Sequence, residues 1–149
     1  MRKLLPWIIP GMLILAADRL IKIFTDGMEK TLIPGVFAIH SARNTGAAMG
    51  ILSGNTFLIL IISIALIGLA VWLLRGMHLS GMAPYALSLI AGGALGNIAD
   101  RILYGYVLDM FEVLFIDFYI FNMADVGVVC GAGLCAISLL FRHQDWSNK

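Results

Sequence analysis

The chain has 149 residues, of which 60% are hydrophobic and 13% are charged. About a quarter of the residues of a soluble domain are charged, so this composition, with a mean hydropathy of +0.94, excludes an ordinary soluble domain and indicates a membrane protein. The net charge is +1 and the sequence has no basic run with interleaved aromatic residues, so no nucleic-acid partner is expected.

Four segments are apolar and long enough to cross a bilayer as helices, which takes about 20 residues. We expect these spans at residues 4–24, 56–74, 81–103 and 119–141. Residues 26–55 are β-rich, with one strand expected at 34–41, and residues 104–118 are expected to form an interfacial loop. The predicted fold class is therefore an all-α polytopic membrane protein, a single membrane-embedded domain with four transmembrane helices and a small β-rich segment outside the membrane.

The basic residues indicate how the chain is oriented. With four spans, both termini and the segment around Arg75 lie on one side, which collects Arg2, Lys3, Arg75, Arg142 and Lys149. By the positive-inside rule this side is cytoplasmic. All acidic residues except Asp145 fall on the other side or in the outer ends of the helices, so we expect the chemistry at the extracytoplasmic face.

Several polar residues stand at the outer ends of the first and third spans. Asp18 and Lys22 are four residues apart on one helical face, and we interpret them as a structural ion pair. Asn97 and Arg101 also share a face, with Asp100 beside them, and this cluster favours a functional or site-supporting role over simple anchoring.

Small residues accompany some of these polar groups. Gly92 and Gly96 of the third span permit close helix packing, and the same face could instead receive a substrate helix. Asn44 precedes Gly46 and further small residues, which fits either a plain turn into a helix or an amide that binds an extended peptide. Both interpretations stay open on composition.

Asp109 and Asp125 are our candidates for a catalytic pair. A hairpin of the last two spans carries both residues to one membrane face. Asn122 and Asp125 also fit a helix cap, because Asn is a favoured N-cap and Asp suits the helix dipole. An ionisable residue that opens a wholly apolar helix is nevertheless a functional-site hypothesis.

The residue types limit the chemistry. The sequence has no Ser or Cys nucleophile with a positioned His, no metal-binding motif and no cofactor fingerprint, and His40 stands alone, so no metal or cofactor is expected. Two Asp side chains in a poorly solvated site share one proton and can hydrolyse a peptide by acid/base catalysis. A small proton-linked membrane carrier that uses the same Asp residues, or a non-catalytic scaffold, is the alternative.

Five motifs together resemble the lipoprotein signal peptidase family, also called signal peptidase II. They occur in the family's order over nearly the whole chain: Asp18 with Lys22, NTGAAM at 44–49, GGALGNIADR at 92–101, GYVLD at 105–109 and FNMAD at 121–125. Three positions depart from the family pattern, namely Met49, Met110 and Val126, and none of them removes a candidate catalytic group. The segment between Asp109 and Asn122 is also short for this family.

The resemblance implies an aspartic endopeptidase of the bacterial plasma membrane, with both termini cytoplasmic. It implies cleavage of diacylglyceryl-modified prolipoproteins immediately before the lipid-bearing Cys, with membrane lipids and globomycin-type inhibitors as further partners and no implied oligomer. The catalytic dyad then corresponds to Asp109 and Asp125, and the family's β-cradle to the β-rich segment. The substrate site corresponds to Asn44, Gly46, Asn97, Arg101 and Asn122, with structural support from Asp18, Lys22 and Asp100.

Overall fold

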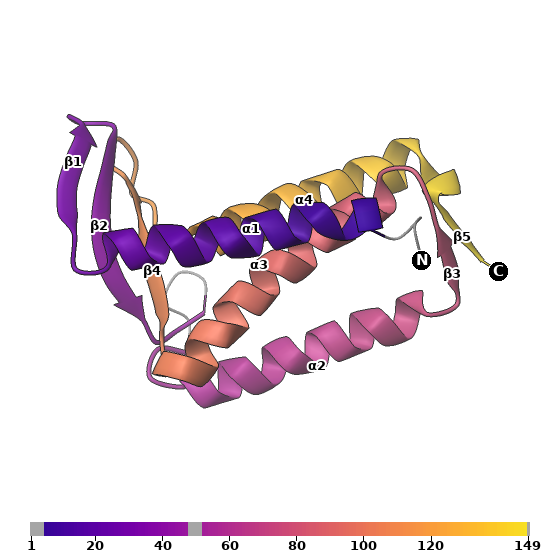
Figure 1. Cartoon of the computed structure of the whole chain (residues 1–149), viewed down its shortest axis with the longest axis horizontal. Coiled ribbons are helices and arrows are strands. Elements are labelled where there is room, and N and C mark those ends of the chain that lie inside the picture. The colour runs from indigo at the N-terminus through magenta and orange to yellow at the C-terminus, as the bar shows by residue number, and fades with distance from the viewer. Residues whose placement is uncertain (1–4, 48–51, 149) are drawn as a thin grey trace.

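The computed structural model describes residues 5–47 and 52–148. Within these residues the chain forms four α-helices: α1 (Leu5–Thr25), α2 (Thr56–Leu74), α3 (Ala83–Tyr104) and α4 (Met123–Phe141). A three-stranded sheet stands at one end of the helices, and a two-stranded sheet lies at the other end (Figure 1). Arg2, Lys3, Met49 and Lys149 lie outside the described residues.

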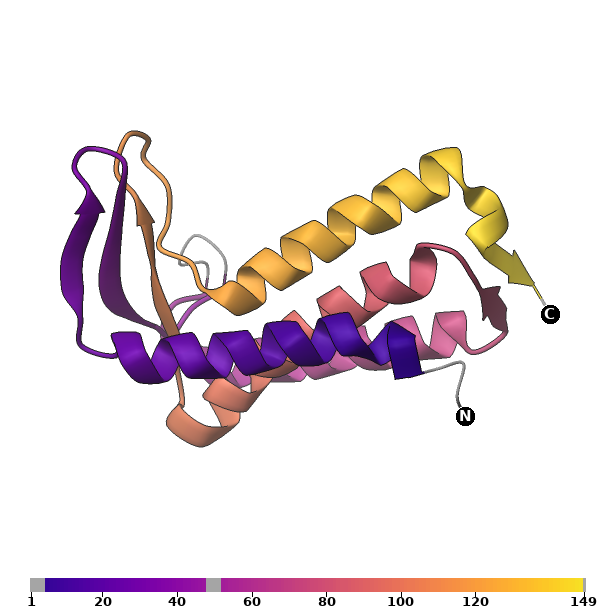
Figure 2. The same ribbon diagram turned by 45° about the horizontal axis from the view of Figure 1, so that its top comes forward.

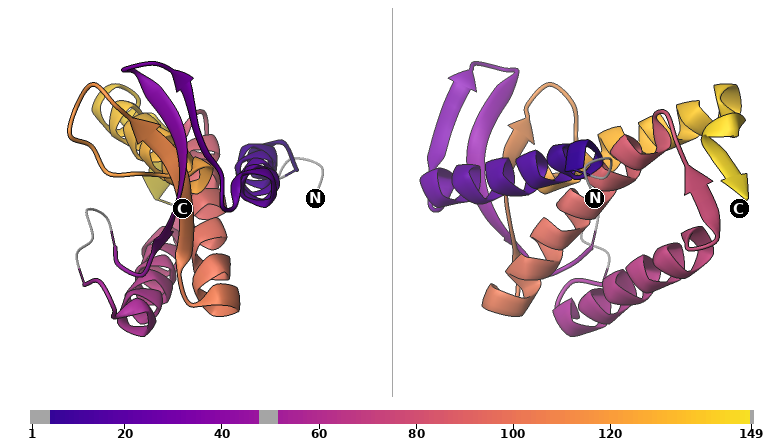
Figure 3. Two further views of the ribbon diagram at one scale, coloured as in Figure 1. Left: turned by 90° about the vertical axis from the view of Figure 1, so that its left-hand side faces the viewer. Right: turned by 45° about the vertical axis from the view of Figure 1, so that its right-hand side comes forward.

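Helices α1, α3 and α4 pack closely, whereas α2 lies to one side of them (Figures 1 and 3). Glycines permit the close packing, because a Cβ atom at Gly92 would meet the backbone of Gly11 in α1, and one at Gly93 would meet the carbonyl oxygen of Ala124 in α4. The Gly92 face therefore packs against another helix of the same chain, which is the helix packing that its small residues predicted. In α2, by contrast, Ile59 is the buried residue among those described.

Large hydrophobic side chains on all four helices are exposed, as in a protein surrounded by lipid. Helices α2, α3 and α4 are each long and apolar enough to cross a membrane, judged over the described residues. Helix α1 has 21 residues but carries Asp18, Arg19 and Lys22 in its second half. Each helix lies in one of the four predicted spans to within two residues at its ends, except that α4 begins at Met123 and not at 119. That the four helices cross the membrane stays a prediction.

The segments at residues 26–55 and 104–118 contain more strand than the sequence predicted. Strands β1 (Glu29–Ile33) and β2 (Phe37–Asn44) form a hairpin, so residues 34–36, placed in a single strand by the prediction, form the turn instead. Gly35 has a φ of +72°, which explains why the chain reverses there.

The predicted interfacial loop at 104–118 is the second correction. It contains strand β4 (Val107–Val113), which pairs antiparallel with β2 to give the sheet order β1-β2-β4. Pairing with β2 satisfies backbone groups that a loop would leave to solvent, and this partner lies more than 60 residues away in sequence, so local patterns did not reveal it. Figure 2 shows this sheet beside the C-terminal end of α1 and the N-terminal end of α4.

The opposite end of the bundle is closed by the C-terminal segment. Strand β5 (Trp146–Asn148), which follows the short helix η2 (His143–Asp145), pairs with β3 (Met77–Leu79) between α2 and α3. The buried Asp145 carboxylate accepts hydrogen bonds from the Met82 N–H at 2.9 Å and the Ser138 hydroxyl at 3.2 Å, and it pairs with Arg142. Donation by the Met82 N–H is the main cause that lowers the pKa of Asp145 below its usual range.

Candidate active site

Asp109 lies on β4, directly opposite Ala42 of β2, and its side chain is buried. Its two carboxylate oxygens have different partners. The Asn44 amide donates to Oδ2 at 2.9 Å, and the Asn122 amide donates to Oδ1 at 2.6 Å. Asn44 ends β2 and Asn122 precedes α4, so three separate segments fix the position of this carboxylate.

Asp125 occupies the first turn of α4, where it forms the predicted cap with Asn122. The Asn122 side-chain oxygen accepts from the Asp125 N–H at 2.9 Å, and Asp125 Oδ2 accepts from the Asn122 N–H at 3.1 Å. This reciprocal pair satisfies backbone N–H groups at the start of the helix. The Asn97 amide of α3 donates to the other oxygen, Oδ1, at 2.8 Å, so the same carboxylate is also part of the site.

Asn122 connects the two aspartates. Its amide nitrogen donates to Asp109 Oδ1 and also to Asn97 Oδ1 at 3.1 Å, while its oxygen caps α4. The neighbouring Phe121 exchanges backbone hydrogen bonds with Phe111 of β4, at 2.8 and 3.0 Å. These bonds hold the start of α4 beside β4, which brings the two carboxylates to one site.

Arg101 connects α3 with the segment after β2. Its guanidinium donates to the Gly46 carbonyl at 2.9 Å and to the Asn97 carbonyl at 3.3 Å, and the Gly46 N–H in turn donates to Asn44 Oδ1 at 2.8 Å. The Nε atom of Arg101 is buried and has no hydrogen-bond partner among the described residues. Arg101 thus positions the backbone around Gly46, and its Nε–H is not used in doing so.

A cavity of about 190 Å³, which we call the aspartate cavity, lies at the centre of these groups. Polar side chains form one part of its wall: Asn44, Asn97, Arg101, Asp109 and Asp125. Apolar and aromatic residues form the rest: Ala47, Val107, Tyr119, Ile120, Val128 and Val129. The cavity is therefore large enough for water and a peptide group and is only partly polar.

Burial raises the pKa of Asp109 to about 6 and is the largest cause of that shift. The Asn44 and Asn122 donors act in the opposite direction, and the charge of nearby Asp125 raises the pKa further. The Asp109 carboxyl therefore keeps its proton to a higher pH than an exposed Asp does. Coupling to Asp125 also means that the two carboxyls titrate as a pair.

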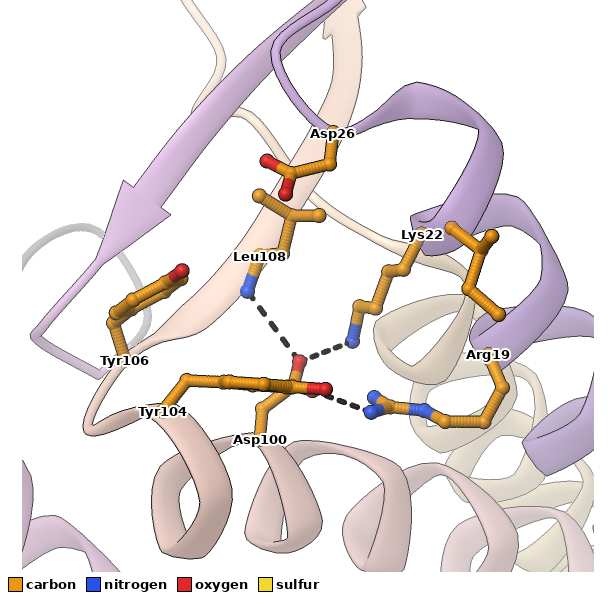
Figure 4. Close-up of a pocket in the computed structure, with 8 residues that line it drawn as sticks. Arg19, Lys22, Asp26, Asp100, Tyr104, Tyr106 and Leu108 are labelled. Carbon is orange, nitrogen blue, oxygen red and sulfur yellow. Dashed lines mark hydrogen bonds and ion pairs between the residues drawn. The ribbon is translucent and has the colours of Figure 1, made fainter.

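A buried charge cluster supports the site from the α1 side. Lys22 Nζ lies 2.8 Å from Asp18 Oδ2 and 2.7 Å from Asp100 Oδ2, so the predicted ion pair of Asp18 and Lys22 is present. Arg19 bridges the same two carboxylates at 2.9 and 2.6 Å, and Figure 4 shows Arg19 and Lys22 converging on Asp100. Arg19 was not among the residues predicted from the sequence, although its position next to Asp18 was a usable signal.

The two carboxylates of this cluster also reach the neighbours of the aspartate pair. Asp18 Oδ1 accepts from the N–H of Ala124, next to Asp125, at 3.0 Å. Asp100 Oδ2 accepts from the N–H of Leu108, next to Asp109, at 3.4 Å. The cluster therefore helps to position both segments that carry the paired aspartates.

Metal binding finds no support in the part of the chain that the structure describes, where no group of three or more His, Cys, Asp or Glu side chains is placed to hold an ion. His40 lies on β2 of the three-stranded sheet, with its Nδ1 atom 3.2 Å from Glu112 Oε2. Two carboxylates, two amides and a guanidinium line one cavity, and the Asn122 amide donates to one of these carboxylates. This arrangement suits acid/base chemistry on a bound peptide.

Comparisons with known proteins agree on one family. Residues 11–141 match the family described as "Signal peptidase (SPase) II". The chain is 39% identical over 144 residues to a lipoprotein signal peptidase of Lactobacillus johnsonii, covering 93% of this chain and 94% of that protein. It is 35% identical over 147 residues to a lipoprotein signal peptidase of Latilactobacillus sakei, covering 95% of this chain and 97% of that protein.

Two solved structures, each described as a bacterial membrane enzyme studied by the in meso method, are also similar. The structure at 2.3 Å resolution is 34% identical with a TM-score of 0.79, covering 91% of this chain and 87% of that chain. The structure at 1.9 Å resolution is 32% identical with a TM-score of 0.75, covering 92% of this chain and 94% of that chain. The similarity therefore extends from sequence to fold over nearly the whole length.

Proposed function

The chain belongs to the signal peptidase II family, and on that premise we propose that it is an aspartic endopeptidase that removes the signal peptide from diacylglyceryl-modified bacterial prolipoproteins. The bond cleaved is the one immediately before the lipid-bearing Cys. Membership of a peptidase family sets the reaction class, whereas the catalytic type and the site residues are our inference from geometry.

One observation carries the proposal. Asp109 and Asp125 line the same cavity and are connected through Asn122, which donates to the first carboxylate and caps the helix of the second. Among the described residues, neither of these two carboxylates forms an ion pair, whereas Asp18 and Asp100 are paired with Lys22 and Arg19. Glu29 and Glu112 line another cavity, but Lys30 and His40 lie beside them there. Asp109 and Asp125 are therefore our catalytic dyad.

The dyad holds one proton between its two carboxyls. The ionised carboxylate removes a proton from a water molecule, whose oxygen attacks the carbonyl carbon of the scissile peptide, while the protonated partner donates a hydrogen bond to the carbonyl oxygen. The C–N bond then breaks and a proton passes to the leaving amine of the Cys. No covalent intermediate with the protein is formed.

The remaining polar groups of the cavity position the substrate. The Asn44 and Asn97 amides are each oriented by a carboxylate, and Arg101 holds the carbonyl of Gly46 in the adjoining segment. We assign these residues to substrate binding, because amides and a guanidinium donate to the carbonyls of an extended peptide. Asn122 is fully buried and its amide donates to Asp109 and Asn97, so we assign it to positioning the dyad. Asp18, Lys22 and Asp100 serve as structural support.

The proposed topology places all four helices across the bacterial plasma membrane as a single domain, with both termini in the cytoplasm. Arg75 and Arg142 stand at the C-terminal ends of α2 and α4, at the end of the bundle opposite the three-stranded sheet. Basic residues at that end favour a cytoplasmic location. The sheet and the dyad are then on the extracytoplasmic face, where the sheet acts as a cradle for the substrate.

The test is a cleavage assay with purified protein in lipid and a diacylglyceryl-modified prolipoprotein. We expect cleavage before the modified Cys by the wild type, inhibition by globomycin, and a loss of at least about a thousandfold in kcat for Asp109→Asn and Asp125→Asn. The matched control is Asp117→Asn, which changes an exposed Asp outside the cavity. Near-normal cleavage by either dyad variant would contradict the assignment.

An uncleaved substrate with a well-folded wild type would contradict the proposed reaction itself. Proton-coupled flux in proteoliposomes, lost in the same two variants, would then favour a carrier that uses the aspartates as a relay.

A further inference from the structure

A second cavity adjoins the aspartate cavity and shares part of its wall. It has a volume of about 220 Å³, and we call it the α4 cavity. It is lined by Phe118, Tyr119, Phe121, Asp125, Val126, Val129 and Cys130. Tyr119, Asp125 and Val129 also line the aspartate cavity, so the two spaces meet at one carboxylate of the proposed dyad.

The α4 cavity differs from its neighbour in chemistry. Val126, Val129 and Cys130 are spaced at i, i+3 and i+4, so they form one stripe along α4. Aromatic rings form the opposing wall, where Phe118 stacks on Tyr119 at 4.3 Å between ring centroids and meets Phe121 edge-on at 5.9 Å. Asp125 is the one charged group in the lining and stands at the junction with the aspartate cavity.

The stripe on α4 also faces outward. Val129 is 65% exposed and Cys130 is exposed, on a helix apolar enough to lie within a bilayer. A route from the surrounding lipid to Asp125 therefore runs along apolar side chains. The aspartate cavity, in contrast, presents Asn44, Asn97 and Arg101, whose polar groups an alkyl chain would leave without hydrogen-bond partners.

The proposed reaction places an apolar group beside the dyad. The scissile bond immediately precedes the lipidated Cys, so the thioether sulfur lies within one residue of the bond that reacts. The acyl chains that continue from this sulfur need an apolar path that begins at the dyad and opens to lipid. Burial of alkyl surface against apolar side chains is favourable, whereas burial against unpaired amides is not.

We propose that the α4 cavity receives an acyl chain of the substrate's diacylglyceryl group and thereby sets the position of the scissile bond at the dyad. This inference rests on the proposed function. It commits to a chain carried by the substrate, because the cavity shares Tyr119, Asp125 and Val129 with the site where that substrate reacts. Val126 and Cys130 belong to the α4 cavity alone and are specificity-determining residues on this proposal.

The first experiment locates the chain without requiring turnover. The probe is a diacylglyceryl-modified lipobox peptide with a diazirine in one acyl chain, irradiated with the Asp109→Asn protein in lipid. We expect labelling at residues 126–130 to exceed labelling at the exposed residues 139–141 of the same helix by about tenfold. A phospholipid with the same diazirine chain is the control and should label both stretches alike. Equal labelling of the two stretches by the peptide would overturn the proposal.

The second experiment uses catalysis. Cys130→Trp fills the α4 cavity, and Leu140→Trp adds the same ring at an exposed position elsewhere on α4. We compare kcat/KM for a substrate with long acyl chains and for one with acetyl groups in their place. Cys130→Trp should lower the ratio of long-chain to short-chain kcat/KM by about tenfold, the scale for a lost apolar subsite contact. Leu140→Trp should leave this ratio within about twofold of the wild type.

The outcomes separate the two proposals. Suppose that the wild type cleaves the substrate. An unchanged ratio of long-chain to short-chain kcat/KM in Cys130→Trp, or labelling away from 126–130, would then overturn the acyl-chain subsite and leave the peptidase proposal intact. Labelling at 126–130 by a wild type that cleaves neither substrate would support the subsite and contradict the proposed reaction. Preferential cleavage of the long-chain substrate by the wild type, together with labelling at 126–130, would support both the peptidase and the acyl-chain subsite.

Discussion

The carboxylate of Asp18 accepts a hydrogen bond from the backbone N–H of Ala124 at 3.0 Å, across 106 residues of sequence. The same carboxylate pairs with Lys22 and Arg19, so its charge is compensated inside the bundle. Through this bond α1 is joined to the first turn of α4, one residue from Asp125. The position of a proposed catalytic group therefore depends on an ion cluster that does not line the aspartate cavity.

Loss of the Asp18 carboxylate should destabilise the protein strongly. Asp18→Ala leaves Lys22 and Arg19 with Asp100 as their remaining carboxylate and removes the acceptor for Ala124. Breaking a buried ion pair by removing one partner costs about 3–5 kcal/mol, which corresponds to a fall in melting temperature on the order of 10 °C in detergent. The control Asp117→Ala, at an exposed position, should stay within about 0.5 kcal/mol of the wild type. Equal melting of both variants would contradict the supporting role of the cluster.

Two substitutions at Asn122 should separate helix capping from the bond to Asp109. Asn122→Ser keeps a side-chain oxygen for the Asp125 N–H, whereas Asn122→Ala removes it, so the Ala variant should be less stable by about 1 kcal/mol. Both variants lose the donor to Asp109 Oδ1. We therefore expect similar falls in kcat, of at least about tenfold, measured beside thermal melting curves. Full activity in the Ser variant would show that the amide donor is dispensable.

The pH dependence of cleavage should follow the dyad. Burial raises the pKa of Asp109 to about 6, so its carboxyl is protonated below that pH and ionised above it. A dyad that works with one proton loses activity when this proton leaves, and kcat/KM should therefore fall as the pH rises through about 6. A flat profile between pH 5 and pH 8 would contradict a shared proton.

Removal of the Asn44 side chain should move the fall of kcat/KM with pH to higher pH. The Asn44 amide donates to Asp109 and stabilises its ionised form, which lowers the pKa. In Asn44→Ala the pKa of Asp109 rises further, and the fall in kcat/KM should shift to higher pH. Ser41→Ala on the same strand is the control, because the Ser41 hydroxyl accepts from the Gly27 N–H, away from the dyad. A shift to lower pH in the Asn44 variant would reverse the assigned role of the amide.

Gly81 should be the more sensitive of two glycines with positive φ. Gly81 has a φ of +53° and Gly35 a φ of +72°, so Ala is strained at both, by about 1–2 kcal/mol. A Cβ atom at Gly35 meets open space, whereas one at Gly81 meets the Asp145 carboxylate and displaces it from the Met82 N–H. We expect Gly81→Ala to melt at a clearly lower temperature than Gly35→Ala. Equal melting temperatures would mean that the C-terminal closure contributes little to stability.

Local sequence determined the helices and several of their contacts. Long apolar runs specify helices in a bilayer, since the backbone must satisfy its own hydrogen bonds there. The cap formed by Asn122 with Asp125 and the pair of Asp18 with Lys22 were also predictable, because each is set by a spacing of three or four residues within one helix.

Only the tertiary structure decided how these pieces meet. The pairing of β4 with β2, the bonds from Asn122 to Asp109 and from the Ala124 N–H to Asp18, and the aspartate cavity all join segments that are separate in sequence. Such contacts have no period or spacing along the chain, because their geometry follows from how α1, α3 and α4 pack around their glycines. The residue types of the site were therefore readable from the sequence, while their arrangement around one cavity was a property of the folded chain.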